Sequence, residues 1–196
     1  TDEQLRTIEQ GIRDMSTELP SSASEIAAVA EAAGQLGVTT EGILDFTETM
    51  INLGEATNLT ADEAASSLAK FANVTDMLET DYSRLGSVVV ALGNTMATTE
   101  ADIVAMGTRI ASAGEQVGLT EDQIMGMAAA LSSVGLEAEA GGTAISKLMT
   151  DMKSSASMAD ETSEMLSKTG MSVRELEMLA DTSASEFKAL ANELGY

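Results

Sequence analysis

The chain has 196 residues and carries 32 Asp and Glu against 10 Lys and Arg, a formal net charge of -22. This charge repels phosphate, so it argues against nucleic-acid binding and against adsorption to anionic membranes. The sequence contains no Cys and no His, which excludes disulfides and thiolate chemistry and removes the usual general base and the commonest metal ligand.

Apolar residues recur at helical spacing along almost the whole chain, whereas strand-like alternation is rare. These stripes predict helices over residues 5–19, 26–36, 43–53, 68–71, 82–96, 103–110 and 124–134. The longest uncharged stretches, 85–99 and 123–136, are shorter than the ~20 apolar residues that a spanning helix needs. We therefore expect an all-α protein without a membrane span.

Helix starts are marked by a Ser or Thr followed three residues later by an acidic or amide side chain, as in a capping box. Six such pairs occur: Ser22 with Glu25, Thr60 with Glu63, Thr99 with Asp102, Thr120 with Gln123, Ser172 with Glu175 and Ser183 with Glu186. Thr39 and Thr80 are weaker candidates for two further starts. Counting from Thr39 to Thr120, the predicted starts recur about every 20 residues, which fits helices of about 15 residues joined by short loops.

One turn is duplicated at an offset of 60 residues, where residues 54–62 match residues 114–122 at five positions. The shared residues are Gly54, Glu55, Leu59, Thr60 and Asp62 in the first copy and Gly114, Glu115, Leu119, Thr120 and Asp122 in the second. In each copy a helix ends in Gly-Glu, a Leu enters the loop and Thr-x-Asp opens the next helix. The pattern predicts a repeated helix pair, 39–74 and 98–134, in an irregular multi-helix bundle with a partly duplicated helix-hairpin array.

The pattern of apolar and polar residues changes after Gly141 and Gly142. A long helix is expected there, followed by two short helices from Ser172 and Ser183. We therefore expect an Ala- and Met-rich core over 1–140 and a C-terminal region over 141–196 that packs on the same domain. Because the chain begins with Thr1 instead of an initiator Met, it is interpreted as a piece of a larger protein.

No catalytic, cofactor or metal site is predicted. About a dozen carboxylates fall in predicted first turns, where they complement the helix dipole, and no calcium-loop or phosphate-binding motif occurs. The Met residues between Met96 and Met165 are interpreted as core filler, with a partner-binding surface as the alternative. Glycines inside the helices, such as Gly11, Gly86, Gly107 and Gly126, either allow close helix contact or keep the helices loose.

The stretch AAGQLGVTTE from Ala32 to Glu41, the capped Ala-rich helices, the repeated Gly-Glu turn and a Gly141-Gly142-Thr143-Ala144 turn together resemble the N-terminal core of phage tail tape measure proteins. The resemblance is best from Ser22 to Met152. It implies a scaffold that is made in the bacterial host cytoplasm and occupies the lumen of the tail tube. The length of the whole protein would set the length of the tube, and the protein would leave the tail ahead of the DNA. It also implies other copies of the chain, tail tube protein and tail assembly chaperones as partners, and no catalytic residues.

Two other functions compete with the scaffold. The chain could be a helical-repeat interaction module that binds a partner helix or peptide in a Met-lined groove. An enzymatic function would require a carboxylate-only hydrolase, with two carboxylates about 5 to 10 Å apart in a site from which water is excluded.

Overall fold

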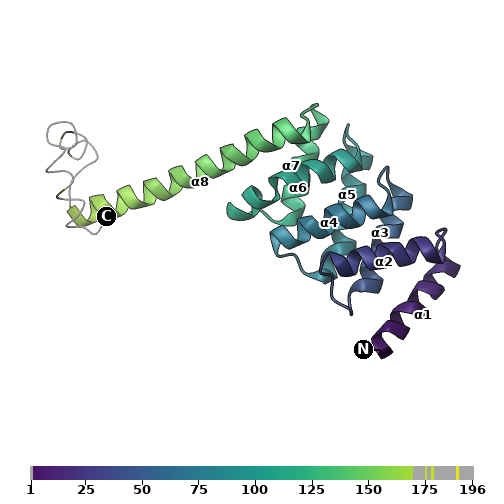
Figure 1. Ribbon diagram of the computed structural model, residues 1–196. Helices are drawn as coiled ribbons and strands as arrows, with labels where there is room; N and C mark the ends of the chain where they lie inside the picture. The colour runs from purple at the N-terminus through teal and green to yellow at the C-terminus, as the bar shows by residue number, and fades with distance from the viewer. Residues whose placement is uncertain (1, 170–174, 176–177, 179–188, 190–196) are drawn as a thin grey trace. The chain divides into compact units, whose positions relative to one another are not determined.

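The computed structural model describes residues 2–169 together with residues 175, 178 and 189 (Figure 1). The chain divides into two compact units, Thr1–Thr150 and Asp151–Tyr196, and the site lies in the first. Across the described residues the regular structure is helical and contains no strand, so the all-α prediction is confirmed. The elements are α1 (Asp2–Glu18), α2 (Ala23–Gln35), α3 (Ile43–Ala56), α4 (Ala61–Thr75), the 3-10 turn η1 (Glu79–Asp81), α5 (Tyr82–Thr95), α6 (Glu100–Gln116), α7 (Glu121–Ser133) and α8 (Ala138–Thr169).

Helices α1 to α7 are stacked in two layers. One layer places α4 between α2 and α6, and the other places α3 between α1 and α5, with α7 beside α5. Most consecutive helices also contact each other across the layers (Figure 1). Each helix pair therefore buries its apolar face against its neighbours, as in other stacked helical arrays.

The spatial repeat differs from the sequence repeat. Starts of stacked helices lie 39 residues apart, from Ile43 to Tyr82 in one layer and from Ala61 to Glu100 in the other. The sequence match at an offset of 60 instead relates the pair α3–α4 to the pair α6–α7. Because α3 and α6 belong to opposite layers, the matching segments are equivalent as turns but not as positions in the stack.

The core is aliphatic and sulfur-rich, as the composition requires. Phe46, Phe71, Met50, Met106 and Met125 are among the largest fully buried side chains, and Ala residues of α4 and α7 fill the close contacts. Buried Phe46 and Tyr82 meet edge to face, with ring centroids 4.6 Å apart. This contact links α3 to α5.

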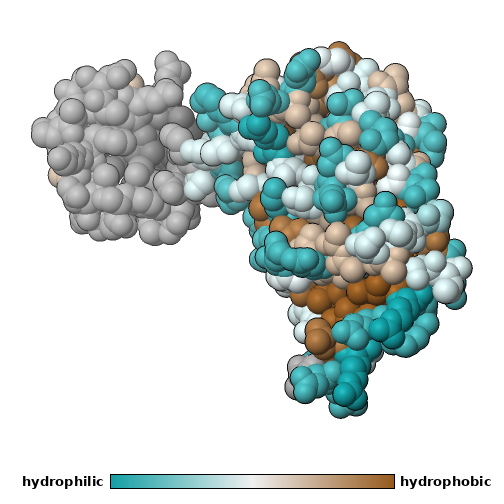
Figure 2. Space-filling model, turned by 45° about the vertical axis from the view of Figure 1, so that its right-hand side comes forward, coloured by the Kyte–Doolittle hydropathy of each residue, from teal (hydrophilic) through white to brown (hydrophobic). Residues whose placement is uncertain are grey.

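Helix α1 is amphipathic but contributes no buried residue. Its residues Ile12 and Met15 are partly buried against the core, whereas Leu5 is 60% exposed. Figure 2 shows the resulting band of hydrophobic surface beside α1, near the bottom of the view. Among α1 to α7, α1 is therefore the helix without a buried residue.

Four predicted caps are present. Ser22, Thr60 and Thr120 form complete capping boxes with Glu25, Glu63 and Gln123, and Thr99 accepts a hydrogen bond from the backbone N–H of Asp102. The helices predicted to begin at Ser172 and Ser183 lie outside the described residues.

The two weaker predictions, helix starts at Thr39 and Thr80, were wrong. Thr39 does not cap α3, because its N–H and hydroxyl donate to the carboxylate of Glu79 at 2.7 and 2.6 Å, and α3 begins after Gly42 without a side-chain cap. Thr80 lies within η1, and α5 begins at Tyr82. A contact between residues 40 positions apart thus replaced a local cap.

The Gly141–Ala144 segment, expected to form a turn, is the second turn of α8. Both glycines are buried against α6: a Cβ on Gly142 would lie 2.8 Å from the Cβ of Arg109, and one on Gly141 would lie 3.3 Å from the Met106 Cε. The pair therefore allows the start of α8 to approach α6 closely. The expected division into 1–140 and 141–196 stays a prediction.

Candidate functional site

The glycines of the duplicated turn mark two close helix approaches. Gly54 lies at the end of α3, where an added Cβ would be 2.9 Å from the backbone nitrogen of Ala61 in α4. Gly114 lies at the end of α6, where an added Cβ would be 2.7 Å from the Ile124 Cγ1 in α7. In both copies the absence of a side chain lets the chain reverse tightly.

The other residues of the turn fix the following helix. Thr60 and Thr120 are the N-caps of α4 and α7. Leu59 precedes the first cap and is buried, and Leu119 precedes the second and is half-buried. Glu55 and Glu115 are exposed.

The Asp of each turn is not the capping partner, because the capping bond runs to the backbone of Glu63 or Gln123. Asp62 instead lines a shallow groove of about 370 Å³ beside Gly54, Glu55, Leu59 and Thr60. Asp122 pairs with Arg84 of α5, which also pairs with Asp81 and Glu121 at 3.5 and 3.6 Å. Asp122 therefore ties the start of α7 to α5, and a purely structural role for the duplicated turn as a whole stays a prediction.

The Met residues pack mainly in the core. Met106, Met125 and Met149 are buried, Met96 and Met127 are partly buried against the core, and Met152 is exposed. The side chains of Met158 and Met165 lie outside the described residues. The structure thus favours core filler over a Met-lined partner groove for the described members.

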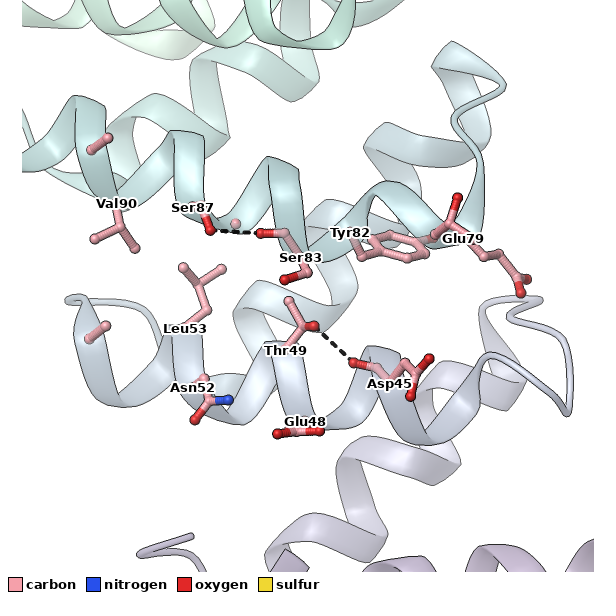
Figure 3. A pocket seen from close by; sticks show the side chains of 14 residues that line it. Asp45, Glu48, Thr49, Asn52, Leu53, Glu79, Tyr82, Ser83, Ser87 and Val90 are labelled. Carbon is pink, nitrogen blue, oxygen red and sulfur yellow. Dashed lines mark hydrogen bonds between the residues drawn. The ribbon is translucent and has the colours of Figure 1, made fainter.

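A second, larger groove in the first unit lies between α3 and α5 and has a volume of about 680 Å³ (Figure 3). Leu53 and Thr49 point from α3 toward Val90 and Ser83 of α5 across the gap, with the Tyr82 ring beside them. Small residues of α5, including Gly86 and Ala91, also line it. None of its lining residues is a Met.

This groove is acidic. Asp45, Glu48 and Glu79 line it, and no Lys or Arg does. The Glu79 carboxylate is held by Thr39, whereas Asp45 and Glu48 are exposed on α3. Burial raises the pKa of the Tyr82 phenol, and the negative charge of Glu79 adds to this effect, so Tyr82 stays neutral.

The groove lacks the water-excluded carboxyl group that a carboxylate-only hydrolase would need. Solvent-exposed Asp45 and Glu48 do not have the dry surroundings that convert a carboxyl group into a general acid. Within the described part of the chain no group of three or more acidic side chains is placed to hold a metal ion. None of the helices that the structure describes is long and apolar enough to cross a membrane.

Sequence reasoning missed this groove. Ser83, Gly86 and Ser87 follow helical spacing on α5, and Asp45, Glu48 and Asn52 do so on α3, so each face was visible as a polar stripe. That the two stripes face one gap depends on the stacking of α3 on α5, which no local pattern encodes.

The family of phage-related minor tail proteins matches residues 9–195, nearly the whole chain. The chain belongs to this family. It is accordingly a structural component of a phage tail, and so of the virion. Neither a curated protein nor a solved structure matches the chain. The capped, stacked helices described above suit such a structural component.

Proposed function

We propose that this minor tail protein is a segment of a tape measure protein, the scaffold inside the tail tube. In this role the whole protein sets the length of the tube during assembly and leaves ahead of the DNA at injection. The family match over residues 9–195 is the observation that supports the proposal most. The resemblance of Ala32–Glu41 and of the repeated Gly-Glu turn to tape measure proteins supports the tape measure role among the roles of minor tail proteins.

Charge gives physical support to a place in the lumen. The net charge of -22 repels DNA, so a protein that precedes the genome through the same channel would not hold it back. The proposed partners are other copies of the chain, tail tube protein and tail assembly chaperones. The segment itself binds neither nucleic acid nor membrane and carries no catalytic activity or cofactor, and it passes from the host cytoplasm into the tail lumen.

Protease protection of intact tails tests the proposal. Purified tails are treated with protease before and after triggered ejection, and antibodies raised against residues 2–150 detect the chain. We expect the chain to be protected in intact tails and to appear in the released fraction afterwards, with a tail-tip protein digested at both stages as the control. Digestion in intact tails would place the chain on the outside and contradict the proposal.

A further inference from the structure

We propose that the groove between α3 and α5 docks a basic amphipathic helix of a partner protein. The proposal does not depend on where in the tail the chain lies, because it rests only on the shape and charge of this groove. It therefore stands or falls separately from the tape measure assignment.

The groove is long enough for a short helix. Its α3 wall runs from Asp45 to Ala56, about 16 Å at a rise of 1.5 Å per residue. Its volume is about 680 Å³, and the α5 wall carries Ser83, Gly86 and Ser87, whose small side chains leave room for a neighbouring backbone. About three turns of helix fit along such a wall.

The floor offers apolar contacts to that helix. Leu53 and Tyr82 lie at the bottom of the groove and are almost fully buried. Half-buried Val90, opposite Leu53, and exposed Ala56 and Ala91 present apolar surface to the groove (Figure 3). A partner with apolar residues at positions i, i+3 or i+4, and i+7 would place them on this floor, which is the usual mode for helices bound in grooves.

The rim selects for positive charge. Asp45 and Glu48 are exposed along α3, and no cation lines the groove. The nearest basic residue along α5, Arg84, is paired with Asp81, Glu121 and Asp122, so it does not neutralise the rim. Lys or Arg side chains of a partner would therefore be attracted to this rim. A second copy of this chain, with its charge of -22, would be repelled from the rim and would have to bind at another surface.

A designed peptide tests the proposal on the complete 196-residue chain. The probe is an acetylated and amidated helical peptide with one Leu- and Ala-containing face flanked by four Lys residues, and a second peptide replaces each Lys with Glu. Binding is followed by fluorescence anisotropy and by backbone amide NMR shifts. We expect the Lys peptide alone to bind, with the largest shifts at Thr49, Ser83 and Ser87.

Two double variants with equal net charge separate the groove from general attraction. Asp45→Asn with Glu48→Gln removes the exposed rim charges, and we expect it to weaken binding by about fivefold or more. Glu115→Gln with Glu137→Gln removes two exposed carboxylates elsewhere, and we expect a change below about twofold. Glu79 stays unchanged because it holds Thr39, and circular dichroism verifies that all variants fold.

Four results would overturn the proposal. The first is that the Lys peptide does not bind at about 1 mM, and the second is that both double variants weaken its binding equally. The third is that the amide NMR shifts map outside the groove. The fourth is that shifts at the groove appear when the chain alone is concentrated. The last result would assign the groove to a second copy of the chain.

Discussion

Thr47 is a buried residue whose hydroxyl lowers the stability of the protein and forms no hydrogen bond in the structure. Its side chain is fully buried in α3, and among the described residues its hydroxyl is the buried side-chain group without a hydrogen-bond partner. Burial of an unpaired hydroxyl costs free energy because the hydroxyl loses its bonds to water.

Replacement of Thr47 by Val should therefore stabilise the protein. We expect Thr47→Val to raise the free energy of unfolding by about 1 kcal/mol, measured by urea denaturation. Thr49→Val is the matched control, because the Thr49 hydroxyl donates to the Asp45 carbonyl at 2.8 Å, and it should leave stability unchanged or lower it. A Thr47→Val protein less stable than the original would contradict this account.

The glycines inside the helices do not share one role. An added Cβ on Gly54 would meet the backbone of α4, and one on Gly107 would lie 2.7 Å from the Met125 Sδ, whereas one on Gly126 would meet nothing within 4 Å. Gly107 fits the close-contact alternative drawn from the sequence, and Gly126 does not.

The same substitution should therefore have opposite effects at two glycines. We expect Gly54→Ala to lower the free energy of unfolding by about 1 to 3 kcal/mol because backbone must shift. Gly126→Ala should raise it by about 0.5 to 1 kcal/mol through helix propensity. Urea denaturation of both variants measures this contrast, and equal changes of one sign would show that these close approaches do not govern stability.

At the scale of elements, helix boundaries were predictable where the signal is local. The boxes at Ser22, Thr60 and Thr120 are local signals of this kind. Thr39 failed because Glu79, distant in sequence, takes its hydrogen-bonding groups, and a tertiary partner of this kind leaves no local trace. The groove was hidden for the same reason, since its walls α3 and α5 come together only in the stack.

The capping boxes give the protein a specific pH dependence. The backbone N–H and the hydroxyl of Thr60 donate to the Glu63 carboxylate at 2.9 and 2.8 Å, which holds the pKa of Glu63 below its ordinary value. Because the folded pKa lies below the unfolded one, this contribution is present above the unfolded pKa and is lost as pH falls through the folded pKa. Gln123 occupies the equivalent place in α7 and does not titrate.

Single substitutions that replace Glu63 by Gln or Gln123 by Glu should change how the free energy of unfolding depends on pH. We expect Glu63→Gln to lose less stability than the original chain between about pH 6 and about pH 3, and Gln123→Glu to lose more. Urea denaturation at each pH provides the measurement. Identical pH profiles for the three proteins would mean that the box carboxylate does not contribute to acid unfolding.

At the scale of the whole molecule, burial predicts uneven stability along the array. Helices α1 and α6 both have 17 residues, yet α1 buries none and α6 buries eight. Length therefore does not distinguish them, but position in the stack does.

Hydrogen exchange compares the two helices directly. We expect backbone amides of α1 to exchange at least about tenfold faster than those of α6, because local opening of α1 exposes little core. Equal protection would show that α1 opens only together with the core. Strong protection from Gly86 to Gly126 would also exclude the loose-helix alternative for these glycines.

In the proposed role, this minor tail protein is a helical framework inside the tail tube. Cryo-electron microscopy of intact tails tests it most directly, by fitting the two-layered array of α2 to α7 into the density. We predict that the array is found within the tube lumen. Density for the array on the outer surface of the tail would contradict the account.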